Sequence, residues 1–361
     1  MQYQIYLKLI YCHLEARKKK RGTKNEYEFE VDLFENLFHL AEEIANFTYT
    51  PSPGIAFVTR KPVIREIFAA PYRDRIVHHL IFSIVEPYWE KRFIDYSCSC
   101  RKNKGTSFGV EVVEKSIRKA TKNYQEPAEV YKFDLSGYFM SLSRGKLYQK
   151  AIQGLDEQFA GRKNHPDYRM VKYLWRKVIM NDATVGVKIR GKIKDWEDLP
   201  KNKSLFCQPR GRGIVIGNLT SQLLSNIFLN DFDHLMQQIH PHCFYIRYVD
   251  DFMIIGNRKY AEKIKAAQPF WQEELRKLGL RINDKKTYHQ TVDKGISFLG
   301  TTVFPYRTVI GKRLKKNMNL AAKRYRNGEI GIDSIVSYTG FTVHHDSYKM
   351  TLEFLKKCGL L

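Results

Sequence analysis

The sequence predicts an α+β fold whose centre is a small antiparallel sheet. Two apolar, aromatic-rich runs, 244–249 and 252–255, flank the pair Asp250-Asp251. β-Forming residues on both sides of a polar pair are typical of a β-hairpin. A further β-branched and aromatic run, 130–133, ends at Asp134. Stretches with helical spacing lie between and after these runs, and the order strand, helices, hairpin, helix, strand is typical of a split βαββαβ unit.

Helices and one short strand are predicted in the N-terminal third. Residues 1–13 are apolar but short, and they run into a basic cluster at 17–21. Apolar residues recur at helical spacing between 28 and 47, which predicts one helix. A short strand carrying Arg65 then leads through Pro71 into a helix that begins near Asp74.

The middle of the chain contributes two loops and an amphipathic helix. A glycine-containing basic loop, 101–106, opens a helix, and residues 185–204 are predicted to form a loop or hairpin excursion. Apolar residues at spacings of three and four predict a helix over 224–239. Three polar residues within it are interpreted as structural or solvent-facing: Asn230, Asp231 and Asp233.

The C-terminal third continues the sheet and ends in a basic segment. A helix over 264–278 is stopped by Gly279, and residues 280–282 are predicted to form a strand. Residues 296–304 predict a further hairpin. From about Arg307 the chain is strongly basic and is predicted to be helical.

The charge balance indicates a polyanionic partner. The 361 residues include 61 Lys and Arg against 38 Asp and Glu, a formal net charge of +23. This excess suits nucleic acid, and it is spread along the chain instead of lying in one tail. The alternative is a basic surface that serves solubility alone. With 43% hydrophobic residues, the chain has the composition of a globular protein.

The cysteines do not predict a disulfide framework or a zinc site. The six cysteines form no CxxC pair and show no disulfide-like spacing. We therefore expect free thiols. Together with the lack of a recognisable leader and of a long apolar segment, they predict a cytoplasmic protein.

Three carboxylates are the candidate catalytic residues. Asp250 and Asp251 are predicted at the tip of a hairpin, where a tight turn does not need two adjacent negative charges. A divalent cation would relieve their repulsion, and two-metal phosphoryl transfer takes a further carboxylate from elsewhere in the fold. Asp134, at a strand end with Gly137 following, supplies one, although Asp is also common as a helix N-cap. We predict that the three hold two Mg²⁺ ions, for which Mn²⁺ can substitute.

Arginines near the first strand are candidates for phosphate recognition. Arg65, Arg73 and Arg75 lie among apolar residues, where a guanidinium is poor core material. They suit a site that grips a triphosphate or a backbone phosphate. Salt bridges to neighbouring acids are the alternative. The basic loop at 101–106 is by itself only a weak signal for phosphate binding.

Together these motifs resemble the motifs of reverse transcriptases. Tyr248-Val-Asp-Asp in its hairpin, with Phe133-Asp134 upstream, is similar to the two catalytic motifs of that family, and the likeness covers roughly residues 50–350. The resemblance implies a right-hand polymerase architecture. Residues 1–60 would form an N-terminal extension and the start of the fingers, 61–300 interleaved fingers and palm, and 301–361 a helical basic thumb.

The resemblance also implies roles for individual residues. The backbone carbonyl of Leu135 would join the metal ligands, and Phe139 would exclude the ribose 2′-hydroxyl. A palm lysine, either Lys285 or Lys286, is expected to protonate departing pyrophosphate. The implied nucleotide-binding set is Arg65, Arg73, Tyr138, Phe139, Ile216, Gly217, Gln222, Lys285 and Lys286. The implied template- and primer-binding set is Arg101, Lys104, Gly105, Tyr248, Phe298, Leu299, Gly300, Lys315, Lys316 and Arg324.

One departure from the common pattern narrows the resemblance. Most of the family has Gln-Gly-x-x-x-Ser-Pro before the palm helix, whereas this chain has Ile216-Gly-Asn-Leu-Thr-Ser-Gln222. This sequence is similar to the signature of reverse transcriptases from diversity-generating retroelements. The resemblance implies that the enzyme copies a template-repeat RNA into adenine-mutagenised cDNA in a bacterial or phage-infected cell. The implied partners are the RNA template, a DNA or RNA primer, deoxynucleoside triphosphates and a small basic accessory protein oligomer. Two alternatives remain: a retron-type or phage-defence reverse transcriptase, and a catalytically silent RNA-binding protein on a polymerase scaffold.

Overall fold

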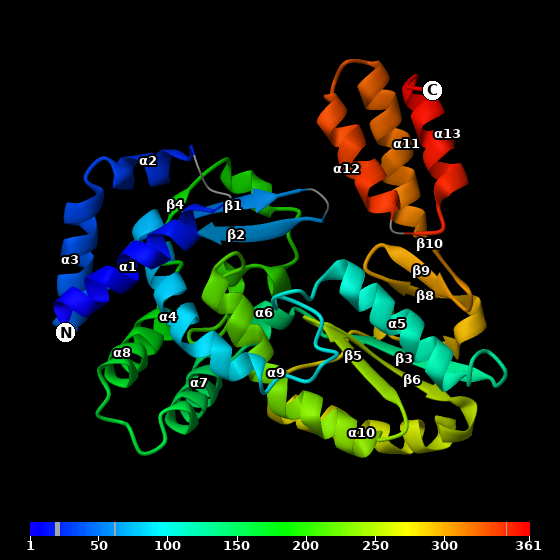
Figure 1. Ribbon diagram of the computed structural model, residues 1–361, viewed down its shortest axis with the longest axis horizontal. Coiled ribbons are helices and arrows are strands. Elements are labelled where there is room, and N and C mark those ends of the chain that lie inside the picture. Colours follow the sequence, from blue (N-terminus) through cyan, green and yellow to red (C-terminus); the bar gives the residue numbers. More distant parts are fainter. Residues whose placement is uncertain (19–21, 61–62, 344) are drawn as a thin grey trace. The chain divides into compact units, whose positions relative to one another are not determined.

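The computed structural model describes residues 1–18, 22–60, 63–343 and 345–361 (Figure 1). Residues 19–21 of the predicted basic cluster, residues 61–62 and His344 lie outside the described residues. The chain divides into two compact units, and each is built from three separate stretches of sequence. Unit 1 comprises Met1–Ile94, Leu135–Phe232 and Gln272–Arg281, and unit 2 comprises Asp95–Asp134, Asp233–Trp271 and Ile282–Leu361.

Unit 1 is mainly helical and carries one small sheet. Its strands lie in the order β2-β1-β4, with β1 and β2 antiparallel and β4 parallel to β1. The strand that carries Arg65 is confirmed as β2, and after Pro71 the next helix begins at Tyr72. The elements of unit 1 are α1 (Gln2–Arg17), α2 (Lys24–Glu30), α3 (Leu33–Ala45), β1 (Ile55–Thr59), β2 (Arg65–Ala69), α4 (Tyr72–Glu90), α6 (Tyr138–Ser141), α7 (Arg144–Gln158), α8 (Pro166–Met180) and β4 (Lys188–Ile189), together with much of α9 (Leu219–Ile239).

The single helix predicted over 28–47 is two helices, α2 and α3. The backbone leaves the helical conformation at Asp32, with φ −118° and ψ 48°. Val31 is 64% exposed and takes no part in the buried stripe of α3, which consists of Leu37, Leu40, Ala41 and Ile44. The helix therefore breaks where an apolar residue of the periodic pattern, Val31, is not buried. Asp at such a position favours a helix start over a helix interior.

Unit 2 contains the predicted antiparallel sheet, so the α+β fold is confirmed. Its strand order is β5-β6-β3-β7, and the register pairs Asp134 with Asp251 and Tyr248 with Asp251. The elements of unit 2 are α5 (Thr106–Ala120), β3 (Ala128–Asp134), β5 (Phe244–Tyr248), β6 (Asp251–Asn257), most of α10 (Ala261–Lys277), β7 (Tyr288–Thr291), β8 (Ile296–Phe298), β9 (Thr301–Phe304), β10 (Arg307–Ile310), α11 (Lys312–Arg326), α12 (Ile332–Thr342) and α13 (Tyr348–Cys358).

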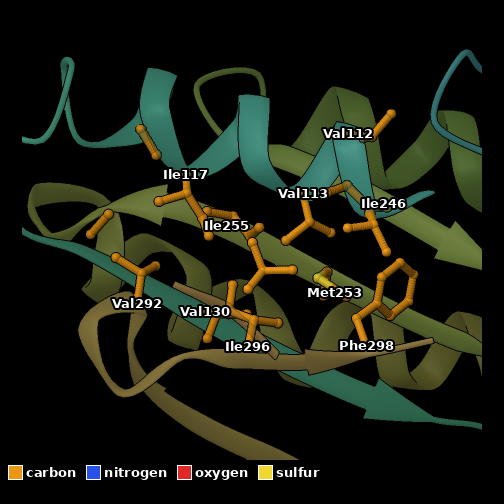
Figure 2. Packing of buried hydrophobic residues seen from close by; sticks show 14 of the residues in the cluster. Val112, Val113, Ile117, Val130, Ile246, Met253, Ile255, Val292, Ile296 and Phe298 are labelled. Carbon is orange, nitrogen blue, oxygen red and sulfur yellow. The ribbon is translucent and has the colours of Figure 1, made fainter. Parts of the chain in front are cut away.

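Alternation along the strands gives this sheet two buried faces. Figure 2 shows Val113 and Ile117 of α5 above the first face, over Val130, Met253 and Ile255. On the second face Phe133 and Phe252 pack against Trp271 of α10, with ring centroids 4.9 and 5.9 Å away. Successive side chains of a strand point to opposite faces. Lys132 and Asp134 therefore share the first face with Val130.

The strand predicted over 280–282 is wrong, because the fourth strand of the sheet is β7. β7 pairs antiparallel with β3, from Glu129↔Thr291 to Lys132↔Tyr288. Leu280 is fully buried, but residues 280–282 do not form a strand ladder. Arg281 instead makes one backbone hydrogen bond, in which the Ser136 amide donates to the Arg281 carbonyl at 2.8 Å. The apolar composition of residues 280–282 therefore did not predict which strand pairs with the second edge of β3.

The hairpin predicted over 296–304 is confirmed as β8 and β9, and it gains a third strand. β10 pairs with β9 over residues that were predicted to begin a helical segment at about Arg307. The β-branched residues Thr308, Val309 and Ile310 explain this strand. The helices begin at Lys312 and form a bundle of α11, α12 and α13 around a small core: Ile310, Met318, Ala322, Ile335, Phe354 and Cys358.

Two further expectations concern the chain as a whole. All six cysteines are free, as expected. Within the described ranges, no helix has both the length and the apolarity needed to cross a membrane.

Candidate active site

The structure brings the three candidate carboxylates together at one edge of the sheet in unit 2. Asp134 is the last residue of β3, Asp251 is the first residue of β6, and Asp250 lies in the turn between β5 and β6. The antiparallel register places Asp134 directly opposite Asp251. Cβ atoms of directly opposed residues lie about 4.5–5.5 Å apart. Three acids that are distant in sequence therefore share one small region.

Burial and neighbouring negative charge raise the pKa values of Asp250 and Asp251. Burial, followed by the charges of Asp134 and Asp251, raises the pKa of Asp250 to about 6. Burial also raises the pKa of Asp251, although the charge and hydrogen bond of Lys132 oppose it. Such perturbation by burial plus neighbouring charge is typical of functional sites. The cluster is electrostatically strained unless a cation neutralises it.

Two lysines supply part of that neutralisation. Lys132 Nζ lies 2.8 Å from Asp251 Oδ2, and Lys286 Nζ lies 2.8 Å from Asp134 Oδ2. Burial lowers the pKa of Lys286, but the hydrogen bond and charge of Asp134 outweigh it, so the pKa lies above its usual value. The sequence left open whether Lys285 or Lys286 serves the site. Both lysines are exposed, but Lys286 is the one whose ammonium contacts a catalytic candidate, Asp134.

The same carboxylates fit a divalent metal by the chemistry of their oxygens. Asp251 Oδ1 is buried and has no hydrogen-bond partner, whereas the Asn283 side-chain amide donates to Asp134 Oδ1 at 3.2 Å. An unsatisfied buried carboxylate oxygen is costly, and Mg²⁺ takes such oxygens as ligands. Over the part of the chain that the structure describes, no group of three or more His, Cys, Asp or Glu side chains is arranged around a metal position. Lys132 and Lys286 each form an ion pair with one of these carboxylates.

The turn that presents Asp250 is strained and is held by a buried arginine. Val249 has φ 58°, in the left-handed region that a β-branched residue rarely adopts. Arg247, fully buried on β5, donates from Nη1 to the Val249 carbonyl at 3.2 Å. It also donates to both oxygens of buried Asp233, at 2.7 and 2.6 Å, and to Ser97 Oγ at 3.1 Å. Arg247 and Asp233 thus fix the backbone that carries the catalytic candidates.

Sequence reasoning missed Lys132 and Arg247. Lys132 precedes Asp134 by two positions on a strand, and period-two alternation was the signal that could have placed it on the same face. Asp233 was grouped with Asn230 and Asp231, yet Asp233 is fully buried while the Asp231 side chain is 73% exposed. The structural interpretation of Asp233 is confirmed.

Three consecutive members of the expected template- and primer-binding set, residues 298–300, form a turn beside the sheet of unit 2. Phe298 is buried at the end of β8, and its ring meets Tyr248 edge-on at 6.3 Å. Leu299 and Gly300 both have positive φ, 48° and 88°. A Cβ at Gly109 of α5 would lie 2.9 Å from Leu299 Cδ1, so the glycine permits this close approach. The turn is therefore seated directly on α5.

The basic loop before α5 is ordered by its own contacts. Arg101 and Lys104 form an isolated β-bridge, and Gly105 precedes the first residue of α5. Arg101 Nη1 donates to the Ser97 carbonyl at 3.1 Å, and Lys104 Nζ donates to the Asp95 carbonyl at 2.7 Å. Farther along unit 2, Lys315 and Lys316 are exposed on α11, and Arg324 pairs with Glu329 at 3.1 Å.

In unit 1, two residues of the expected nucleotide-binding set share an apolar cluster. Phe139 and Ile216 both pack against a core of Ala56, Phe68, Met140 and Leu205. Gly217 follows with φ 120°, and a Cβ there would meet Ile67 and Phe68 at 3.7 Å. The side chain before Gly217 is thus held by shape alone, since Ile216 carries no hydrogen-bonding group.

Other members of the expected set lie elsewhere in unit 1. Tyr138 is buried and donates to the Ser225 carbonyl at 2.6 Å, which is a structural contact. Gln222 is exposed on α9, and Leu135 is fully buried. Arg65 is exposed at the start of β2. Arg73 instead pairs with Glu43 and donates to Ser52 Oγ at 3.1 Å, the salt-bridge alternative considered from the sequence.

The chain is similar in sequence to known proteins. Residues 61–303 match the family model for reverse transcriptase (RNA-dependent DNA polymerase). The chain is 25% identical to Protein YkfC of Escherichia coli (strain K12) over 313 residues, which is 76% of this chain and 72% of that protein.

Solved structures of telomerases share the fold. An apo telomerase from Candida tropicalis, truncated from its C-terminal domain, gives a TM-score of 0.52 at 13% identity, covering 75% of this chain and 59% of that one. A telomerase from Candida albicans in complex with a telomeric RNA fragment gives 0.52 at 14% identity, covering 82% and 54%. The chain spans little more than half the length of these telomerases, so the likeness concerns the right-hand polymerase fold alone. Because the family match covers most of the sequence, the chain belongs to the reverse transcriptases and is an RNA-directed DNA polymerase.

Proposed function

We propose that the enzyme copies RNA into DNA by two-metal nucleotidyl transfer at Asp134, Asp250 and Asp251. The observation that carries the proposal is the antiparallel register, which sets Asp134 opposite Asp251 with Asp250 beside them. These carboxylates would hold two divalent ions, Mg²⁺ being the natural choice for oxygen ligands. When bound, the ions activate the attacking hydroxyl and neutralise charge on the departing pyrophosphate.

The chain's own residues have distinct parts in this proposal. Asp134 and Asp251 would hold the ions through carboxylates that contact Lys286 and Lys132 in this structure. Lys286, whose Nζ lies 2.8 Å from Asp134 Oδ2, is beside these carboxylates. There it would donate a proton to the leaving pyrophosphate, a role the resemblance assigns to Lys285 or Lys286. The contact with Asp134 favours Lys286 for it.

We further propose that the enzyme is of the diversity-generating type and makes errors at template adenines. Support comes from the sequence Ile216-Gly-Asn-Leu-Thr-Ser-Gln222 and from the apolar surroundings of Ile216. A site that hydrogen-bonds its substrate rejects an incorrect one far better than an apolar site does. Ile216 contributes shape and no hydrogen bond, which lowers discrimination against a wrong nucleotide.

The test is primer extension on a defined RNA template with Mg²⁺, followed by sequencing of the cDNA. The wild type should yield cDNA whose errors cluster at template adenines, and an Asp250→Ala/Asp251→Ala variant should yield none. Ile216→Gln should lower the error frequency at adenine, while Ile216→Val, which preserves an apolar side chain, should leave it unchanged. Accurate cDNA from the wild type would instead support a retron-type or phage-defence enzyme.

The same proposal includes a small basic accessory oligomer. Two basic proteins repel each other, so their contact needs apolar area. On α1, Tyr3, Leu7, Tyr11 and Leu14 form an exposed apolar row, each 48–71% exposed. Leu7→Asp/Tyr11→Asp should abolish co-purification with the accessory protein while extension of a short generic primer–template continues. Loss of both together, or of neither, would contradict this assignment.

A further inference from the structure

An aromatic ledge in unit 2 has no part in the catalytic arrangement described above. It consists of Tyr124, in the loop after α5, and Phe304 and Tyr306, at the β9–β10 hairpin. The rings of Tyr124 and Tyr306 lie 4.0 Å apart between centroids, and Tyr306 is 76% exposed. A tyrosine with one ring face supported by another tyrosine and most of its surface in solvent is a platform for a further flat ring.

The backbone of the ledge is strained. Lys122, Asn123 and Tyr124 have φ values of 47°, 59° and 68°, and Tyr306 also has φ 68°. Left-handed backbone at residues other than glycine costs about 1–3 kcal/mol each and persists at sites where function requires the geometry. Both tyrosines are therefore presented by backbone that their own sequences do not favour.

A cavity of about 470 Å³ opens beside the ledge and is polar. Two carboxylates in its wall, Glu114 and Asp346, are both engaged by Thr308: its hydroxyl donates to Glu114, and its amide donates to Asp346 Oδ2 at 2.9 Å. Carboxylate oxygens retain lone pairs for additional donors. They repel a phosphate but accept hydrogen bonds from the exocyclic amines of adenine, cytosine or guanine.

One cation lines the same cavity. The Arg307 guanidinium lies 5.0 Å from the centre of the Phe304 ring. Two further cations are engaged near Tyr124 in sequence: Arg118, on α5, donates from Nε to Asn123 Oδ1 at 2.9 Å, and Lys122 pairs with Glu126. Aromatic faces, carboxylate acceptors and the Arg307 cation therefore line one cavity, a combination that suits a base with its backbone phosphate.

The ledge is remote from the catalytic carboxylates within unit 2. Tyr124 precedes the first residue of β3, Ala128, whereas Asp134 is the last residue of that strand. The strand has seven residues and so spans roughly 20 Å. A base on the ledge is therefore not the base being copied.

We propose that the ledge is a second nucleic-acid subsite, which stacks an amine-bearing base of single-stranded RNA on Tyr306. The inference rests on the enzyme acting on RNA, as its family does. The favoured ligand is an unpaired, purine- or cytosine-containing stretch of the RNA that the enzyme copies. Uridine, which has no exocyclic amine, is the poorest fit to Glu114 and Asp346.

The experiment measures fluorescence anisotropy of labelled RNA with the full chain, while an excess of blunt RNA–DNA hybrid occupies the catalytic centre. Tyr306→Ala should weaken binding of an oligoadenylate of about 12 nucleotides by roughly 5- to 100-fold, the effect of losing one stacked base. Tyr306→Phe retains the ring and should bind as the wild type does. Tyr348→Ala is the matched control, since Tyr348 is also 76% exposed and lies in the same unit.

Each outcome decides the proposal. Wild-type affinity in Tyr306→Ala, or an equal loss in Tyr348→Ala, would overturn it, as would oligouridylate binding as tightly as oligoadenylate. Oligodeoxyadenylate that binds more tightly than the RNA would overturn the choice of RNA and point to the cDNA product. Tyr306→Ala should extend a short primer–template at the wild-type rate, and loss of that extension would show that Tyr306 serves the catalytic centre instead of a second subsite. Failure of the wild type to extend the primer would count against the polymerase function and not against the ledge.

Discussion

The buried pair Arg247–Asp233 should matter for stability and catalysis in separable ways. Arg247→Met removes the guanidinium and leaves the Asp233 carboxylate buried at 0% exposure, with the Tyr245 hydroxyl at 2.8 Å as its remaining described hydrogen-bond donor. Removing one partner of a buried ion pair typically costs about 3–5 kcal/mol. Since whole domains are stable by only about 5–15 kcal/mol, we expect a large fall in the free energy of unfolding.

The second step removes the stranded charge. Asp233→Asn on top of Arg247→Met leaves no buried ion, and the asparagine side-chain oxygen still accepts from Tyr245. We therefore expect the double variant to regain about 2 kcal/mol or more relative to Arg247→Met alone. Catalysis should not recover, because the Val249 carbonyl still lacks its 3.2 Å donor and the turn that carries Asp250 is unsupported.

Urea unfolding measures the free energy of unfolding. Single-turnover primer extension, at a temperature where every variant is folded, measures catalysis. Arg247→Lys retains the charge but loses the two-pronged geometry, so it should fall between the wild type and Arg247→Met on both scales. A cost below about 1 kcal/mol for Arg247→Met would show that the buried pair is not what holds this region. Full recovery of the extension rate in the double variant would show that Arg247 has no positioning role.

Three further perturbations follow from the same site. The pKa of Asp250 is raised to about 6, so the native state binds a proton more tightly than the unfolded chain does. The metal-free protein should therefore lose roughly 3 kcal/mol of stability as the pH rises from about 4 to above 6. Melting curves of Asp250→Asn, recorded in a chelator, should lack this dependence on pH. Val249→Gly relieves a penalty of about 1–2 kcal/mol for positive φ, while the greater conformational entropy of glycine stabilises the unfolded chain by about 0.4–1 kcal/mol. The melting temperature should therefore stay equal or rise slightly, and a marked fall would show that Val249 is not strained. Trp271→Ala empties a fully buried site against Phe133 and Phe252 and should cost about 3–5 kcal/mol in denaturant titration, and a loss below 1 kcal/mol would contradict the packing.

Alternating patterns made the sheet predictable. The hairpin around Asp250 and the strand ending at Asp134 were found because polar residues interrupt β-forming runs at defined places. The sequence could not show which strand would pair with the second edge of β3, since pairing over long separations leaves no local trace. The apolar residues Leu280 and Ile282 predict a strand at 280–282, whereas β7 carries the polar residues His289 and Gln290.

The electrostatic partners of the site were harder to predict than its carboxylates. Two adjacent lysines, Lys285 and Lys286, have the same local chemistry, and only the backbone turn decides which one reaches Asp134. Among the polar residues of α9, burial depends on helical phase: Asp233 follows Leu229 by four positions and precedes Met236 by three, so it lies on the buried face. A period-based reading could have separated it from exposed Asp231.

The interleaving of the two units has a consequence for how the chain is made. Asp134 leaves the ribosome long before its ladder partner Asp251, by roughly 10 s at synthesis rates of about 5–20 residues per second. Throughout that interval β3 has neither of its sheet neighbours, β6 and β7, and the unpaired N–H and C=O groups along both of its edges can pair with other chains. The central strand of the catalytic sheet is thus the part of the nascent protein most in need of a chaperone, and slow translation between these two aspartates would favour aggregation over assembly of the active site.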